Sequence, residues 1–462
     1  MNNFLLSWFH PRTLGVFSFL GILGYAATVQ ASFSVCAVGR VTTVDSGRTI
    51  PNGANAGDTE DYWASADSSI NVGAPGIYIT YTYEDGQAGG GGGGFADSNG
   101  CFLVTDDATK VNEVRIYSMT DAGNTVRVHD SPFSFVQTPG NLWYYSFINQ
   151  NHKNNQTYTY IVGTGDAKWT PLFVGSFVSE AFDSHVVGKS IHIGINGSCP
   201  NSNMSAHYPT GAASPNRSNG QITSGNHFLV MNNCTGTSRA RHKFHISHEM
   251  GHALLALFYG SAAGAVNGDE PNTGNTTNDS DPTRAPNAAV CVADPGYSID
   301  SKEWNSVTFR EGYAHWAAAS VWSDRNDPGV AGAAGSGQEG SFTWFQLPED
   351  LERYGQGSGI LAGGRLENIC CTSGCTTSWD SAGTNGDWLR FLWDFYTDTA
   401  CSIDPSQISL LNIYRSTRLN GGLTLGNYYK KSRAAMAQLN SDSCIQSRWD
   451  VWAAWNGVDN DI

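Results

Sequence analysis

After residue 31, the chain begins with short runs in which apolar and polar positions alternate, separated by clusters of Gly, Asn, Asp and Ser. Strict alternation is the pattern of a strand that buries one of its two faces. The clearest run spans residues 77–83, and no long helical period interrupts the series. Residues 32–130 are therefore predicted to form a small β-sandwich. The other predicted strands are residues 38–41, 101–104, 114–117 and 126–129.

Consecutive glycines occupy residues 89–94, inside this first region. A phosphate-binding loop would continue into Gly-Lys-Ser/Thr and a helix, and neither follows the glycines. Because glycine has the greatest backbone freedom of any residue, the segment is predicted to be a mobile loop.

From about residue 131 the pattern shifts towards helices. Residues 171–182 are predicted to be a helix that begins at a proline, which suits the first turn. Residues 191–195 and 227–231 are apolar enough to be buried strands. The segment 131–462 is therefore predicted to fold as an α+β domain.

Residues 238–259 are predicted to be a helix, because a serine that can cap its start and a glycine that can end it flank an apolar run. The next segment, 261–287, is dense in Gly, Asn, Asp and Thr, so a long surface loop is expected there. Aromatic residues recur at helical spacing over residues 387–398 and 448–455. Such stripes are typical of helices that close a hydrophobic core.

Residues 1–31 have the pattern of a secretory signal peptide. Arg12 precedes an apolar stretch at 14–27, and residues 29–31 offer a small-residue cleavage site. The stretch is shorter than the ~20 apolar residues that cross a bilayer. The mature protein is therefore expected to be secreted, extracellular or periplasmic, with no membrane segment after signal removal.

The charge and the cysteines agree with export. The whole chain has a net charge of −15, which argues against nucleic acid and anionic membrane surfaces as partners. Its 10 cysteines suit an oxidising compartment. Cys36 and Cys101 are the only cysteines of the first region and are predicted to pair. The cluster Cys370, Cys371 and Cys375 is predicted to form disulfides, because no histidine lies nearby to complete a metal site.

Candidate chemistry is concentrated in His248-Glu249-Met250-Gly251-His252. On a helix, residues four positions apart lie on the same face, so His248 and His252 can bind one Zn²⁺ together. Glu249 can then reach a water molecule on the metal and act as its general base. A catalytic zinc normally takes three protein ligands, so a third must come from elsewhere in the chain.

Glu311, within Phe-Arg-Glu-Gly-Tyr-Ala-His at residues 309–315, offers that ligand on a second predicted helix. The segment resembles the Glu-Gly-x-Ala segment of the gluzincin metallopeptidases, the clan of thermolysin and the large aminopeptidases. The resemblance implies that His248, His252 and Glu311 bind zinc and that Glu249 is the general base. Glu303 is a rival third ligand without that sequence context. No His-x-x-Gly-x-x-His sequence continues the helix, which excludes the metzincin arrangement.

The chain departs from thermolysin-like enzymes at His315, where they carry an Asp that holds a zinc-bound histidine. His315, Tyr313 and Tyr354 are candidates for the donor that stabilises the oxyanion of the reaction. His315 lies one helical turn from Glu311 and is nearest the site, so it is the tentative catalytic choice. An alternative role of equal weight is that His315 supports one of the zinc-binding histidines. His245 is predicted to be structural, because a fourth ligand would close the site.

The segments 38–51 and 96–102 resemble the transthyretin-like domain found beside carboxypeptidases, which implies a β-sandwich in the first region. The chain is thus expected to be a multidomain protein, with this sandwich followed by a gluzincin-like α+β domain. The expected function is that of a secreted zinc metallopeptidase with protein or peptide substrates, which pair with the strand at 227–231.

Two other functions remain open. One is a secreted binding protein on a catalytically silent peptidase scaffold, although the intact Glu249 argues against it. The other is a zinc hydrolase of non-peptide amides or esters. Acidic groups within 261–287 could bind Ca²⁺, but they lack the spacing of a known calcium loop, so one zinc ion is the only cofactor expected.

Overall fold

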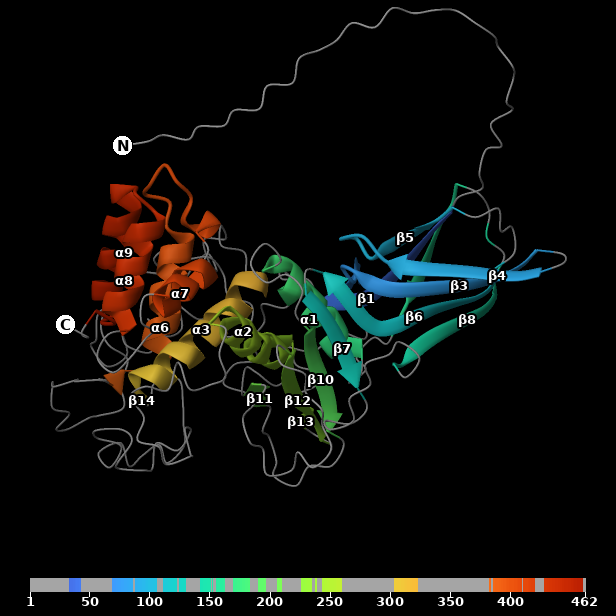
Figure 1. Ribbon diagram of the computed structural model, residues 1–462, viewed down its shortest axis with the longest axis horizontal. Coiled ribbons are helices and arrows are strands. Elements are labelled where there is room, and N and C mark those ends of the chain that lie inside the picture. Colours follow the sequence, from blue (N-terminus) through green and yellow to red (C-terminus); the bar gives the residue numbers. More distant parts are fainter. Residues whose placement is uncertain are drawn as a thin grey trace, which may run out of the picture.

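Figure 1 shows the computed structural model of the protein, in which strands gather at one end and the helices of residues 385–455 at the other. The predicted signal peptide at 1–31, the predicted loop at 261–287 and the predicted disulfides of the cysteine cluster at 370–375 lie outside the residues that the structure describes. The described residues are 33–42, 69–85, 88–105, 111–122, 124–129, 142–150, 152, 155–162, 169–182, 190–196, 206–209, 226–234, 237–238, 243–259, 303–322, 382–383, 385–408, 410–419 and 428–459.

The smaller sheet is built around β1 (Phe33–Thr42). β2 (Ser69–Gly73) and β5 (Cys101–Val104) run antiparallel to β1, and β9 (Thr157–Ile161) runs parallel to it. Cys36 and Cys101 stand opposite each other in this register and form a disulfide. The pairing predicted for these two cysteines is therefore confirmed.

The larger sheet has nine strands among the described residues. Its first part consists of β3 (Ile77–Asp85), β4 (Ala88–Phe95), β6 (Val111–Ala122), β7 (Asn124–His129) and β8 (Tyr144–Gln150). The order across the sheet is β4-β3-β6, and β8 and β7 pair with successive parts of the far edge of β6. All of these pairs are antiparallel.

The second part of this sheet continues from β7 through β10 (Ser190–Asn196) and β12 (Asn226–Cys234), which are parallel. β11 (Ala206–Pro209) lies antiparallel at the outer side of β12. One sheet therefore joins strands on both sides of residue 130. The domain boundary predicted at that residue stays a prediction.

The two sheets share a hydrophobic core. Phe33 and Val35 from β1, Ile77 and Ile79 from β3, and Val114 from β6 are all buried in one cluster. Burial of apolar surface contributes roughly 25 cal/mol per Å², so this shared cluster helps to hold the two sheets together.

The glycine run is a strand, so the prediction of a mobile loop was wrong. β4 pairs with β3 along its whole length. A Cβ atom at Gly90 would lie 2.5 Å from the Tyr83 ring, and one at Gly92 would lie 2.6 Å from the Tyr81 hydroxyl oxygen. The tyrosine rings of β3 thus lie over these glycines, and a Cβ atom at Gly91 would lie 2.5 Å from the backbone oxygen of Tyr81, so the pairing leaves little room for larger side chains.

The described α-helices are α1 (Trp169–Ala181), α2 (Lys243–Tyr259), α3 (Asn305–Trp322), α6 (Asn385–Thr397), α7 (Leu410–Leu419), α8 (Tyr428–Leu439) and α9 (Ser443–Trp455). The helices predicted at 171–182, 387–398 and 448–455 correspond to α1, α6 and α9. Sheets and helices together confirm an α+β architecture. No described helix has the length and hydropathy required to cross a bilayer.

The start of α2 corrects another prediction. Ser238 does not cap the helix, because it belongs to β13 (Thr237–Ser238), which pairs with the end of β12. The helix begins at Lys243, after the chain has left the sheet. A local capping signal was outweighed here by strand pairing.

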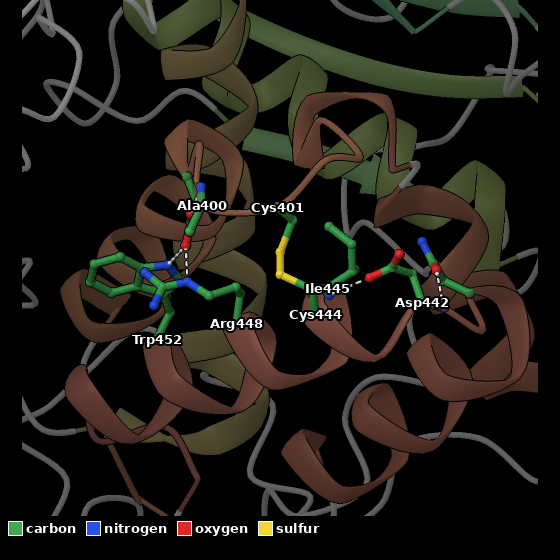
Figure 2. Close-up of a disulfide and its surroundings, with 9 residues drawn as sticks. Ala400, Cys401, Asp442, Cys444, Ile445, Arg448 and Trp452 are labelled. Carbon is green, nitrogen blue, oxygen red and sulfur yellow. Dashed lines mark hydrogen bonds and ion pairs between the residues drawn. A yellow bond between two sulfur atoms is a disulfide. The ribbon is translucent and has the colours of Figure 1, made fainter.

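A disulfide and a carboxylate hold the C-terminal helices together (Figure 2). Cys401, after α6, is bonded to Cys444 at the start of α9. Asp398 accepts hydrogen bonds from the Arg448 and Trp452 side chains, and from the backbone N–H of Ala400 at 2.7 Å. With Cys36–Cys101, this bond makes two described disulfides, which indicate an oxidising, non-cytoplasmic location.

Candidate metal centre

Helix α2 presents the two histidines of the sequence motif on one face. His248 and His252 are one turn apart, and their ring centroids lie 4.7 Å from each other. The two Nε2 atoms are 3.1 Å apart, so both rings direct the same nitrogen to one point. α2 packs against α1, α3, β11 and β12, which hold it in place.

Helix α3 brings Glu311 to the same point. Its Oε2 atom lies 3.1 Å from Nε2 of His248 and 3.4 Å from Nε2 of His252. Among the described residues, these three form a group whose ligand atoms all lie within 4.8 Å of one another. The three residues predicted as zinc ligands therefore converge, although Glu311 is far from the histidines in sequence.

The spacing of the three atoms suits a small metal ion. Zinc bonds to imidazole nitrogen and carboxylate oxygen are about 2.0–2.2 Å long, which places neighbouring ligands of a tetrahedral site roughly 3.4 Å apart. The observed separations are 3.1, 3.1 and 3.4 Å. Two imidazoles and one carboxylate are also a donor set of catalytic zinc sites, which keep a fourth position for water or substrate.

The electrostatics of the centre favour an ionised carboxylate. Burial raises the pKa of Glu311, but His252 and His248 outweigh burial and hold the pKa well below its usual value. Burial lowers the pKa of His252, and the Glu311 carboxylate outweighs it, so that this pKa is raised. A cation placed between these groups would take over the role of the imidazolium charge.

The approach of α3 to α2 depends on Gly251, which the sequence analysis did not single out. A Cβ atom at Gly251 would lie 2.9 Å from Cα of Ala314 and 3.1 Å from Cβ of Ala317. Both distances are shorter than ordinary carbon contacts, so a larger residue would push the helices apart. A glycine in the middle of a predicted helix was the available signal, because such glycines usually have a packing reason.

Glu249 and His315 lie beside the three converging residues. Glu249 is only 7% exposed, and its charge is near enough to His252 to raise the pKa of that histidine. The ring centroid of His315 lies 4.5 Å from that of His248. Burial, with His248 as a further cause, lowers the pKa of His315 well below its usual value, so its imidazole is neutral.

Other predicted site residues fall elsewhere. Tyr313 is fully buried in the core, with its ring 5.5 Å from Trp316 and 5.7 Å from Tyr414. Tyr354 lies outside the described residues. His245 and Glu303 belong to α2 and β14 (Glu303–Trp304), but only their backbones are described.

β12, which contains residues 227–231, is not the edge of the sheet. β10 pairs with it on one side and β11 on the other, where Ala206 stands opposite Val230 and Pro209 opposite His227. The prediction that a substrate pairs directly with this strand was therefore wrong. Sequence gave no strong pattern for a strand as short as β11, so its pairing was not foreseen.

No protein-family model matches the chain, and no curated protein matches it.

Proposed function

We propose that the protein is a secreted zinc-dependent peptidase whose metal is held by His248, His252 and Glu311. The observation that carries the proposal is the convergence of two Nε2 atoms and one Oε2 atom from α2 and α3. The finer fold assignment, a transthyretin-like sandwich followed by a gluzincin-like domain, belongs to the same proposal. It is supported by the two sheets with a shared core and by the helix that carries the motif.

The residues have distinct roles in the proposed reaction. Zinc in this site would supply a Lewis acid and lower the pKa of a coordinated water molecule. Glu249 accepts a proton from the attacking water and later passes it to the leaving amine. Two observations support this role: Glu249 follows His248 directly in α2, and its charge is close enough to His252 to raise the pKa of that histidine.

The outer strand of the larger sheet favours a peptide as the substrate. β11 ends the described strand order on this side, and it contacts α2 as well as β12. An extended peptide can add to such an edge through main-chain hydrogen bonds. A peptide bound along β11 would run beside the helix that carries Glu249.

The decisive experiment compares the secreted wild-type protein with Glu249→Gln. Zinc content is measured first, and hydrolysis of a broad peptide library second. We expect both proteins to bind one zinc ion, and the variant to lose about 10²–10⁴-fold in rate, which is the usual contribution of a general base. Glu113→Gln, which removes a carboxylate of β6, is the matched control and should cleave like the wild type.

Two outcomes would contradict the proposal. If the wild-type protein binds no zinc, the centre is not a zinc site. If the wild-type protein binds zinc but cleaves no peptide faster than Glu249→Gln does, the centre is not that of a peptidase. Cleavage of small amides or esters, without peptides, would instead favour a hydrolase of other substrates.

A further inference from the structure

His315 is a neighbour of the metal centre with no role in the proposed function so far. It stands four residues after Glu311 on α3, so both side chains project from the same face of that helix. Its ring contacts the ring of His248 on α2, with 4.5 Å between the centroids and 52° between the planes. His315 therefore touches a proposed ligand from the other helix.

The geometry separates His315 from the ligands themselves. Among the described residues, the group whose donor atoms lie within 4.8 Å of one another consists of His248, His252 and Glu311, without His315. A fourth protein ligand would also close the position that a catalytic zinc keeps for water. Direct metal binding is thus the weaker explanation for a histidine at this place.

The contact is held by the same crossing that brings Glu311 to the centre. Gly251 and Ala314 fix the separation of α2 and α3 at that crossing, and His315 follows Ala314 directly in the chain. The His315 ring cannot withdraw from His248 without a shift of α3 or a change of its own rotamer. An imidazole packed in this way restricts the rotation of the imidazole that it touches.

We infer that His315 is a positioning residue, whose ring packs against His248 and holds that imidazole in the orientation that binds zinc. It acts through His248 and contacts neither metal nor substrate. The inference rests on the proposed function only in requiring that the centre binds zinc. Groups that orient metal ligands typically contribute 10–100-fold to metal affinity.

The test compares three forms of the full secreted protein: wild type, His315→Ala and His315→Phe. Phenylalanine keeps an aromatic ring but has no nitrogen, so it can pack against His248 and cannot bind metal or donate a hydrogen bond. Zinc affinity is measured by competition with a chelator. The visible absorption spectrum of Co²⁺ in the site reports the geometry of the ligands independently of any activity.

We expect His315→Ala to bind zinc about 10–100-fold more weakly than the wild type and to change the Co²⁺ spectrum. His315→Phe should restore zinc affinity to within about threefold and return the wild-type spectrum. Val321→Ala, a truncation further along α3, is the control and should bind zinc like the wild type. If His315→Ala does not fold, as circular dichroism would show, the phenylalanine variant alone decides.

The outcomes distinguish this inference from the proposed function. Absence of zinc binding by the wild type contradicts the proposed function itself. Suppose that the wild type binds zinc normally and that the alanine and phenylalanine variants both bind it equally weakly. That result overturns the positioning role, because the nitrogens of His315 would then be needed. Unchanged affinity and spectrum in His315→Ala would overturn it as well.

Discussion

Gly251 lies between the two histidines of α2, and its lack of a side chain sets how closely α3 can approach. The Cα atom of Ala314 would be only 2.9 Å from a Cβ atom at this position. Glu311 lies one turn before Ala314 on the same helix, so the place of the proposed third ligand depends on this contact. A single residue without chemistry of its own thereby controls the geometry of the centre.

We expect Gly251→Val to lower the free energy of unfolding by about 1–3 kcal/mol, because its side chain would overpack the helix crossing. Displacement of Glu311 should also weaken zinc binding by about tenfold or more. Urea unfolding and zinc competition measure the two effects. Ala434→Val, at an exposed position of α8, is the control for the helix propensity of valine alone. Equal stability of Gly251→Val and the wild type would show that the crossing of α2 and α3 can accommodate a larger side chain.

At the scale of elements, a buried pair of histidines joins β7 to β10. Nε2 of His129 lies 2.9 Å from Nδ1 of His192, and the two side chains are 5% and 4% exposed. Burial lowers the pKa of His129 to about 4, with Arg127 adding to the effect. Burial, then His129 and Arg127, lowers the pKa of His192 to about 3. Both imidazoles are therefore neutral in the folded protein at neutral pH.

This pair predicts a loss of stability in acid. Above pH about 6.5, the ordinary histidine pKa, folded and unfolded chains are equally deprotonated and the full stability is present. As the pH falls from there towards about 4, the two imidazoles bind protons in the unfolded chain but stay neutral in the folded chain. Each imidazole then costs up to about 1.4 kcal/mol per pH unit.

Urea unfolding at pH 7, 6 and 5 checks the prediction on the wild type and on the double variant His129→Gln, His192→Gln. Glutamine can still form hydrogen bonds but does not titrate in this range. The difference in unfolding free energy between the two proteins should shrink as the pH falls. Parallel pH profiles would mean that the pair titrates normally in the folded state.

At the scale of the whole molecule, local patterns were good predictors and long-range contacts were not. The spacing of His248 and His252 and the aromatic stripes of α6 and α9 are properties of single helices, so the sequence alone revealed them. The choice of Glu311 relied on a family resemblance as well as on its own helix. The glycine strand β4, by contrast, depends on its pairing with β3.

The same reason explains what was missed in the centre. The contact of Gly251 with Ala314 and the place of β11 outside β12 are set by elements distant in the chain. No local periodicity encodes such contacts, because they depend on which surfaces meet after folding. Likewise, Ser238 pairs in a strand instead of capping the helix as its sequence context predicted.

Zinc would connect α2 with α3, which are far apart in the sequence, so its removal should lower the stability of the protein without unfolding it. At a zinc concentration 1,000 times the dissociation constant, binding adds about 4 kcal/mol to the free energy of unfolding. In the metal-free protein, the side-chain contacts of Glu311 with His248 and His252, at 3.1 and 3.4 Å, keep the helices together. We therefore expect a chelator to lower the Tm while far-UV circular dichroism stays native.

Addition of zinc should restore the Tm. Glu311→Ala is the control, and its Tm should respond to chelator and zinc much less than that of the wild type, because one of the three proposed ligands is gone. A separate scan with reductant distinguishes the metal from the disulfides Cys36–Cys101 and Cys401–Cys444, which the chelator leaves intact. A wild-type Tm that is the same with chelator and with zinc would contradict a structural link through the metal. If only Glu311→Ala fails to respond, the link between α2 and α3 passes through the three residues that converge in the centre.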